Sequence, residues 1–508
     1  MAKSRKEEKK KEKREQTGEI DLNSGPVPEV SCGTEFSLAA IREAVVTNRY
    51  LQILIVLTAI GAFLRLYHLD FNSLWLDEAS TLSFAVQSPE AIWAATVGGE
   101  FNPPLFYWIE HAMLFFGNSE TILRLVPALA GILMIPVIYL MGRDLFDKNT
   151  GIIAAALMSV SPFHIFYSQE ARAYSLALLF LSVAFLFFLR AYRSNDMKSW
   201  LLFGVFSALA FWSHFYSAIL VGLLLLFALG MKVRDYCKDP KSLVPLILGI
   251  GAFGIICLPL IIAVLQLFVL RTSAAPTYGI QGFSIIWLSI QQFLGFNPVV
   301  SGILFLLFII GIIQIFRSDL SWGILFSLVI LGTFIVSWGL SYKMPMIPRY
   351  LLFLLPFFFI GIAVINKPVT AFVHRRSAIY LLIAGFMVLS AVLLPSYYTT
   401  YSKEDWRGFS HQFGTMTKEG DIVVVLPGYI RQPLNYYYNN STAGTFEYGA
   451  YSVAEIENIT RTGNGTQTFF IMTGDIASAD PSGNVVDWVQ SNTTYIGADM
   501  RIYLFRSR

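Results

Sequence analysis

The sequence predicts an all-α polytopic membrane protein with a small α/β domain at its C-terminal end. Of the 508 residues, 55% are hydrophobic and 14% are charged, and the mean hydropathy is +0.57, whereas a soluble domain carries about a quarter charged residues. Uncharged runs such as 173–189 and 302–316 recur along the chain, and long apolar runs are typical of membrane-spanning helices. Residues 398–508 lack such runs and indicate a separate domain.

The N-terminal residues 1–48 are expected to form a disordered, basic cytoplasmic tail. Residues 1–16 contain eight Lys or Arg and four Glu, a composition typical of disorder. No apolar segment follows before about residue 50, so the tail is not a signal peptide. Because Lys- and Arg-rich segments stay in the cytoplasm, the chain is expected to start inside and to cross the membrane first at about 50–67.

Loop charges predict the orientation of the spans. Residues 68–102 carry five acidic residues and no Lys or Arg, as expected for an external loop. The apolar stretches 103–117 and 285–295 are predicted to be interfacial helices, since 10–14 residues are too few to span. The domain 49–397 would then contain eleven spans and place the C-terminus outside the plasma membrane. The further ten spans are expected at 124–142, 151–168, 173–192, 199–213, 215–231, 243–268, 299–316, 320–341, 350–366 and 378–396.

The external domain is expected to contain buried strands at 421–427, 468–474 and 501–506, with helical stretches at 433–439 and 485–490. Acceptor sequons of the form N-x-S/T agree with an external location. They begin at Asn439, Asn440, Asn458, Asn464 and Asn492.

The sequence offers little for metal, redox or nucleotide chemistry. The three cysteines, Cys32, Cys237 and Cys257, are far apart and form no CxxC pattern, so neither a disulfide framework nor a zinc–thiolate site is expected. GxGxxG and P-loop patterns are absent from the external domain. No metal, cofactor or nucleic-acid partner is predicted.

Polar residues gather at the outer ends of the predicted spans. Ionisable groups at a membrane surface are costly and usually functional. Cations there suit a lipid phosphate, which Arg binds with its planar fork, and a partly desolvated carboxylate suits proton removal from an acceptor. Asp77 is interpreted as this base, with Glu78 beside it. The other candidates are Glu100, Asn102, Glu110, His111, Glu170, Arg172, His214, Tyr216, Arg271, Lys343, Arg349 and Tyr350.

Each candidate also has a structural interpretation. Asp77 and Glu78 could stabilise a helix N-terminus, and Glu170 could pair with Arg172. Arg349 could be a snorkelling anchor. The histidines and tyrosines could belong to the polar and aromatic belt of the membrane surface, and Asp405–Arg407 could tie the last span to the external domain.

A series of motifs resembles one enzyme family. LWLDEA, NPPLFYWIEHAMLFFG, GRDLFD, SPFHIFYSQEARAYSLALLF, SHFY, PRYLLFLLP and KEDWRG occur in this order over residues 50–410. They resemble the GT-C glycosyltransferases, in the family-39-like branch of protein O-mannosyltransferases and aminoarabinose transferases of lipid A. The resemblance implies inverting transfer of a sugar, such as mannose, from a polyprenyl-phosphate donor to a hydroxyl of a glycan, lipid or protein outside the membrane. It also implies that Asp77 is the catalytic base.

Departures from the family pattern refine these expectations. The aminoarabinose branch has Glu-Lys before the proline of the interfacial helix, but this chain has Glu100-Phe101-Asn102. That difference argues against aminoarabinose and leaves the phosphate to Arg349, Lys343, Arg271 or Arg172. The substrate pocket is expected to contain Asn102, Glu170, Tyr350 and His111. The absence of a WWDYG-type signature argues against transfer of a whole oligosaccharide.

Two other functions fit the composition: a transporter or flippase of lipid-linked sugars, and a binder without turnover. Transporters often have repeated halves with ionisable groups near mid-membrane. Here no repeat is evident and the ionisable groups lie at outer span ends, which favours the enzyme.

Overall fold

The computed structural model of the protein describes residues 43, 45–100, 102–272, 276, 278–295, 297–368, 375–462 and 467–508. Most of the predicted N-terminal tail, with Cys32, lies outside the described residues, and so does Asn464. The chain divides into Met1–Gln52 and a second unit, Ile53–Arg508. The second unit contains a helical bundle and a C-terminal sheet.

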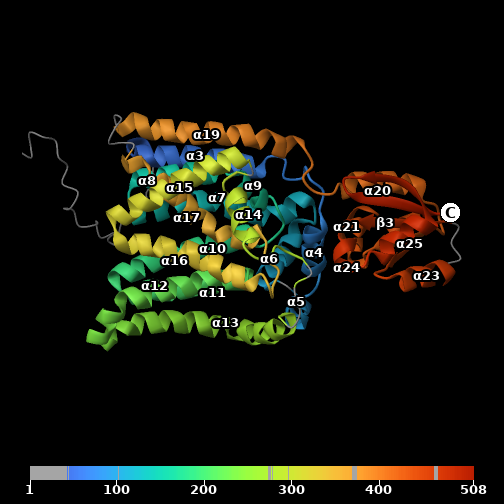
Figure 1. The fold of residues 1–508 in the computed structure, drawn as a ribbon, viewed down its shortest axis with the longest axis horizontal. Helices are drawn as coiled ribbons and strands as arrows, with labels where there is room; N and C mark the ends of the chain where they lie inside the picture. The colour runs from blue at the N-terminus through green and yellow to red at the C-terminus, as the bar shows by residue number, and fades with distance from the viewer. Residues whose placement is uncertain are drawn as a thin grey trace, which may run out of the picture. The chain divides into compact units, whose positions relative to one another are not determined.

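The bundle consists of long helices joined by short ones (Figure 1). The long helices are α3 (Arg49–Leu66), α7 (Glu120–Leu145), α8 (Lys148–Val160), α10 (Tyr174–Ser194), α11 (Met197–Ser213), α12 (Ser217–Lys238), α13 (Val244–Arg271), α15 (Pro298–Ser318), α16 (Leu320–Leu340) and α19 (Arg375–Thr399). The shorter ones are α4 (Leu76–Ala85), α5 (Pro89–Gly98), α6 (Leu105–Met113), η1 (Leu114–Phe116), α9 (Pro162–Ser168), η2 (Pro240–Leu243), α14 (Ser284–Phe293), η3 (Pro348–Leu354) and α17 (Leu355–Ala363).

Nine helices of the described residues are long and apolar enough to cross a membrane, and a tenth span results if α8 and α9, bent by 60°, count as one. The 17-residue helix α11 is shorter than these. The eleven predicted spans each coincide with one of these helices, but because α11 falls short of the length required, the number of spans stays a prediction. The protein is therefore a multi-pass membrane protein. Helices α6 and α14, of 9 and 10 residues, are too short to span, as predicted.

Small residues bring the central helices close together. Helix α10 packs against α7 and α11, and α11 packs against α13. A Cβ atom added to Gly204 on α11 would collide with the carbonyl oxygen of Gly249 on α13. Close approach of backbones through small residues is how helices associate in a membrane, where lipid is as apolar as the side chains.

The C-terminal domain is built on a five-stranded sheet in the order β2-β1-β3-β5-β4. β1 runs parallel to β2 and β3, and β5 runs antiparallel to β3 and β4. The strands are β1 (Ile422–Leu426), β2 (Phe446–Gly449), β3 (Thr468–Thr473), β4 (Thr493–Asp499) and β5 (Ile502–Ser507). The helices are α20 (Trp406–Met416), η4 (Gly428–Ile430), α21 (Arg431–Tyr437), α22 (Asn440–Ala443), α23 (Val453–Thr462), α24 (Ile476–Ala479) and α25 (Asn484–Asn492).

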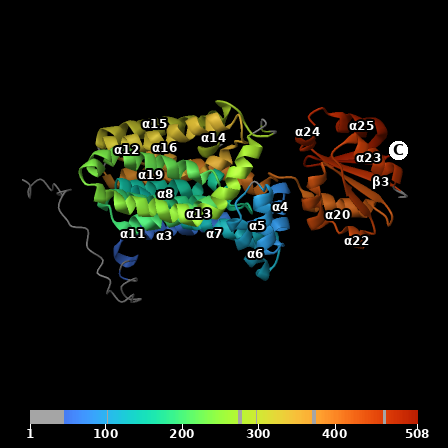
Figure 2. The same cartoon turned by 90° about the horizontal axis from the view of Figure 1, so that it is seen from below.

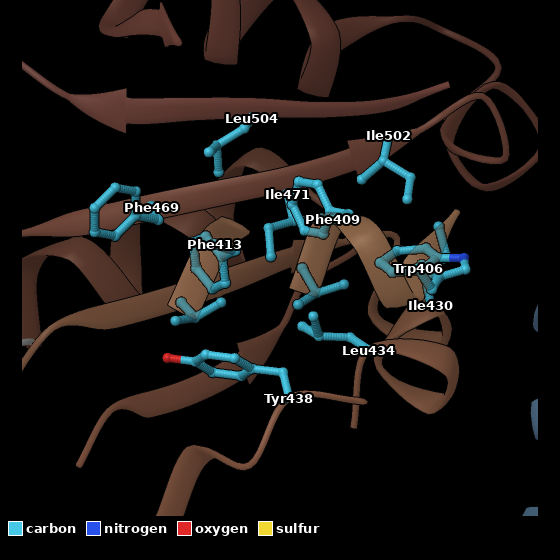
Figure 3. Packing of buried hydrophobic residues seen from close by; sticks show 12 residues of the cluster. Trp406, Phe409, Phe413, Ile430, Leu434, Tyr438, Phe469, Ile471, Ile502 and Leu504 are labelled. Carbon is cyan, nitrogen blue, oxygen red and sulfur yellow. The ribbon is translucent and has the colours of Figure 1, made fainter. Parts of the chain in front are cut away.

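Helices cover both faces of this sheet. Alternate residues of a strand point to opposite faces, so Val423 and Val425 belong to the apolar cluster under α20 and α21. Figure 3 shows Phe469 and Ile471 of β3 in the same cluster, beside Phe409 and Phe413 of α20. Ile422 and Val424 pack instead against α23, α24 and α25. Figure 2 shows α20 and α25 on opposite sides of the strands. Burial on both faces explains the continuous apolar runs from which β1 and β3 were correctly predicted. β5 was also correctly predicted, although Tyr503 and Arg506 are exposed.

The loop that precedes α4 is hydrogen-bonded to the segment between α19 and α20, to the start of α20 and to α21. The Ser73 hydroxyl donates to the Glu404 carbonyl at 2.7 Å and accepts from the Trp406 amide at 3.0 Å. The Leu74 amide donates to the Tyr437 hydroxyl at 2.7 Å. These contacts fix the start of α4, which carries the acidic pair.

Candidate active site

Helix α4 places Asp77 and Glu78 in its first turn. Consecutive residues of an α-helix point about 100° apart, because the helix has 3.6 residues per turn. The two carboxylates therefore face different surroundings. Glu78 is fully buried, whereas the side chain of Asp77 is 24% exposed.

Glu78 is held by four donors. Arg124 of α7 donates to both of its oxygens at 2.7 Å, the Ala171 amide donates at 2.9 Å and Lys403 donates at 3.2 Å. Burial alone would raise the pKa of this carboxyl, but the positive charges of Arg124 and Lys403 outweigh burial and lower the pKa to about 2. A carboxylate offers about four acceptor positions, so none is left for a substrate. We interpret Glu78 as the anchor of α4 rather than as a base.

Lys403 joins Glu78 to a second buried carboxylate. Its ammonium lies 3.6 Å from Oε2 of Glu170, in the turn between α9 and α10. Glu170 is fully buried and accepts no hydrogen bond from the described residues. Burial raises the pKa of Glu170, against the opposing charges of Lys403 and Arg349. Glu170 is thus an incompletely compensated charge within the site.

Asp77 pairs with Arg349. Nη2 of Arg349 donates to Oδ2 of Asp77 at 2.8 Å. The Asp77 backbone carbonyl accepts from Nη1 of Arg172 at 3.2 Å. The structure thus brings together three of the predicted site residues, from segments far apart in the sequence, although Arg172 reaches the Asp77 backbone rather than its carboxylate.

Unpaired buried donors surround this pair. The Arg349 guanidinium lies over the ring of Trp75, 5.2 Å from its centre, and over the ring of Tyr174 at 5.6 Å. Nε of Arg349, Nε1 of Trp75 and the Tyr174 hydroxyl are buried without a partner in the described part of the chain. Buried polar groups are normally hydrogen-bonded, so these donors offer unused binding capacity to an anionic or hydroxylated ligand.

A cavity of about 270 Å³ opens beside this group. Its polar lining comes from Glu100, Asn102, His214, Tyr216, Tyr278 and Tyr350. Its apolar lining includes Phe215, Ile219, Val264, Leu267, Phe268 and Met344, from α12, α13 and their surroundings. This combination suits a ligand with a polar head and a hydrocarbon chain.

Aromatic rings connect the cavity to Arg349. Tyr350 lines the cavity, and the Arg349 guanidinium lies 5.9 Å from the centre of its ring. His214 packs against Tyr350 and Tyr174, with ring centres 5.3 Å apart in each case. Burial, with the charges of Arg172 and Arg349, lowers the pKa of His214 to about 3. The imidazole of His214 is therefore neutral, and the positive charge on this side of the cavity comes from Arg172 and Arg349.

The other predicted site residues lie elsewhere. Lys343 is exposed in the turn after α16 and does not line the cavity. Nδ1 of His111 lies 2.7 Å from the Ala85 carbonyl at the end of α4, away from the cavity lining. Arg271 ends α13, and its side chain lies outside the described residues. Arg349 and Arg172 are therefore the cations best placed for a phosphate.

Two site residues were missed at the sequence level. Arg124 was taken as the edge of a span, and Lys403 was seen only as part of the KEDWRG motif. The available signals were an Arg at the end of an apolar stretch and an isolated Lys shortly after the last predicted span. Among the described residues, no group of three or more His, Cys, Asp or Glu could hold a metal ion.

Comparison with known proteins identifies the fold. The profile of the family described as dolichyl-phosphate-mannose-protein mannosyltransferase matches residues 102–262. No curated protein sequence matches the chain significantly.

Solved structures match over most of the chain. ArnT from Cupriavidus metallidurans in the apo state aligns with a TM-score of 0.57 and 14% identity, over 92% of this chain and 98% of ArnT. The same enzyme bound to undecaprenyl phosphate gives 0.58 and 14%, over 89% and 97%. The Archaeoglobus fulgidus oligosaccharyltransferase AglB, in complex with an inhibitory peptide and a dolichol-phosphate, gives 0.53 and 12%, over 89% and 73%. The chain therefore has the predicted GT-C fold.

Proposed function

We propose that the protein transfers a sugar, such as mannose, from a polyprenyl-phosphate donor to an acceptor hydroxyl, with inversion and with Asp77 as general base. One observation carries the proposal: a partly exposed carboxylate is held by an arginine beside an amphiphilic cavity. The family profile and the similar structures, two of which contain a polyprenyl phosphate, support the same class of donor.

The donor is proposed to occupy the cavity and to contact the arginines beside it. Its prenyl chain would contact the apolar lining from α12 and α13, and its phosphate would bind Arg349 and Arg172. Arg is suited to phosphate because its fork donates two parallel hydrogen bonds. The unpaired donors of Trp75 and Tyr174 would contact the phosphate or the sugar hydroxyls.

Transfer would then proceed in one displacement. An oxygen of Asp77 takes the proton of the acceptor hydroxyl while the acceptor oxygen attacks the anomeric carbon from the side opposite the phosphate. The bond between this carbon and the phosphate oxygen breaks, and polyprenyl phosphate leaves with one additional negative charge. Arg349 and Arg172 stabilise that charge as it develops, which is where preorganised electrostatics lower a barrier.

The ion pair of Asp77 with Arg349 would make donor binding precede proton removal by Asp77. Arg349 donates to the Asp77 carboxylate at 2.8 Å. A phosphate that binds Arg349 competes for the same guanidinium and releases Asp77 to act as a base. In this way the base becomes available only when the donor is present.

The reaction is proposed to face the outside of the plasma membrane, with a cytoplasmic N-terminus and an external C-terminal domain. The distribution of loop charges supports this orientation. It places the site on the same side as the C-terminal domain, to which the start of α4 is bonded.

The decisive experiment is turnover by purified Asp77→Asn. Wild type and variant are incubated with polyprenyl-phosphate mannose or glucose and with an alkyl mannoside or a Ser/Thr-rich peptide. Released polyprenyl phosphate and the anomeric configuration of the product are measured. Loss of a general base typically costs about 10²–10⁴ in rate, so we expect a loss of this size, with an inverted product in wild type.

Asp70→Asn is the matched control, because Asp70 is an exposed carboxylate seven residues earlier in the same loop; it should keep wild-type turnover. Equal turnover by Asp77→Asn and wild type would exclude Asp77 as the base. Movement of a lipid-linked sugar across vesicles without any transfer would favour a transporter instead.

A further inference from the structure

The C-terminal domain contains an open groove of about 540 Å³ that the proposed transfer reaction does not use. This volume falls in the range of about 300–1,000 Å³ typical of small-molecule sites. The groove is formed by α21, the turn that follows it, α22 and the edge strand β2. Its principal lining residues are Arg431, Asn435, Tyr436, Tyr437, Asn440 and Glu447, and we call it the α21–β2 groove.

A hydrogen-bonded network keeps these side chains in place. The carboxylate of Glu447 is only 4% exposed. It accepts from Nε of Arg431 at 2.5 Å and from the Asn435 amide at 3.2 Å. The Asn440 amide donates to the same carboxylate and, at 3.1 Å, to the side-chain oxygen of Asn435. Planar polar groups are thereby preorganised, which reduces the entropy lost when a ligand binds.

The lining indicates the chemistry of the ligand. It contains tyrosines, amides, a serine and one ion pair but no aliphatic side chain, which argues against a lipid chain. The charges of Arg431 and Glu447 cancel, which argues against phosphate or a cation. The Arg431 side chain remains 43% exposed and uses Nε for its ion pair, so its other donors face solvent. Amide, guanidinium and hydroxyl groups can each pair with sugar hydroxyls, and tyrosine rings can pack on the apolar face of a sugar.

We propose that the α21–β2 groove binds a neutral saccharide. Binding does not depend on the proposed transferase activity. If the saccharide belongs to a glycosylated acceptor, however, the role rests on that activity and names the acceptor class. Tyr437 then connects the two sites, because its hydroxyl accepts from the amide of Leu74, three residues before Asp77, and donates to Glu120 at 2.8 Å.

The same chemistry has a second possible source within the chain. Asn439 and Asn440 both begin acceptor sequons and both line the groove. An N-glycan on one of them could fold back into it. The Asn440 amide is already bonded to Glu447 and Asn435, which favours a saccharide from outside the chain.

The test is binding of mannotriose to the full-length protein in nanodiscs, followed by saturation-transfer NMR and titration. Asn435→Ala removes an exposed amide of the groove and should weaken binding tenfold or more. Asn484→Ala, an exposed amide at the start of α25 on the opposite face of the sheet, is the matched control and should bind as wild type does. Asp77→Asn should also bind normally, so that failure of the groove and failure of the transfer mechanism are distinguished.

Intact mass before and after peptide-N-glycosidase treatment separates the two sources. Binding by the unglycosylated protein assigns the groove to an external saccharide. A glycan on Asn439 or Asn440, with mannotriose binding only after its removal, assigns the groove to the chain's own glycan. No binding to treated or untreated protein, or equal affinity of Asn435→Ala and wild type, would overturn the proposal.

Discussion

Glu78 and Asp77 differ in what their carboxylates contact, and the difference has consequences for stability. Glu78→Gln keeps the shape of the side chain but removes its charge from a buried ion pair with Arg124. Breaking such a pair costs about 3–5 kcal/mol, because the remaining charge is left uncompensated. We therefore expect a large drop in the melting temperature of the purified variant, measured by thermal unfolding in detergent.

The pH dependence of stability tests the same contact. The folded-state pKa of Glu78 is lowered from 4.5 to about 2, so its carboxylate stabilises the fold above about pH 4.5 and this contribution is lost as the pH falls toward 2. The melting temperature of wild type should decline over this acidic range, and that of Glu78→Gln should decline less. Identical pH profiles for the two proteins would mean that Glu78 does not hold this charge network.

The sequence alone could not predict that Asp77 and Glu78 have different partners. The pair stood out because no cation lies nearby in the chain. Its partners follow only from the fold: Arg124 lies 46 residues from Glu78, Lys403 lies 325 residues from it, and Arg349 lies 272 residues from Asp77. A local sequence pattern covers only the neighbouring residues of one helical turn. The partners of a buried charge come from segments that are distant in the sequence and that only the fold brings together.

At the scale of elements, the segment between α19 and α20 completes the site through Lys403. Lys403→Met would leave Glu170 buried without its nearest cation. Glu170 would then compete with the donor phosphate for Arg349. We expect tenfold or greater loss of donor affinity, measured as binding of radiolabelled polyprenyl phosphate. Glu170→Gln introduced into Lys403→Met should restore much of this affinity, because removing both partners removes the uncompensated charge.

Lys403→Met, Glu170→Gln and the double variant together form a double-mutant cycle. If the two residues are coupled, their effects on donor affinity are not additive. Arg407→Gln serves as the control. Arg407, near the start of α20, forms a partly exposed ion pair with Glu120 of α7. Breaking this pair should leave donor affinity unchanged. Additive losses in the double variant would show that Lys403 only supports the fold.

Helices and strands were predictable from the sequence where nearly all their residues are apolar. The apolar stretches stay apolar whether they are largely buried, as α10 is, or largely exposed at the outside of the bundle, as α13 and α15 are, where lipid is as apolar as the side chains. Strands β1 and β3 are buried throughout, and β5 lies inside the sheet between β3 and β4, so apolar residues dominate their sequences as well. Strands β2 and β4 lie at the edges of the sheet. No residue of β2 (FEYG) is buried, and only Thr493 of β4 (TTYIGAD) is buried. An edge strand is partly solvated and therefore lacks a continuous apolar run, which explains why neither was predicted.

At the scale of the whole molecule, the orientation in the membrane decides which compartment the candidate active site faces. Loop charges predict that the turn after α12 is cytoplasmic and that the C-terminal domain is external. Cys237 lies near the end of α12 and is exposed. Ser482, just before α25, is exposed in the C-terminal domain and can be replaced by cysteine.

We expect a membrane-impermeant maleimide, applied to intact cells, to label Ser482→Cys but not Cys237. Both should react after permeabilisation. Cys32 and Cys257 are replaced by serine in both proteins, and Cys237 is also replaced by serine in Ser482→Cys, so that each protein contains one thiol. Protection of Ser482→Cys together with labelling of Cys237 would reverse the topology. Asp77 would then open to the cytoplasm, because the start of α4 is bonded to the C-terminal domain through Ser73 and Leu74, and donor and acceptor would both have to be available on that side.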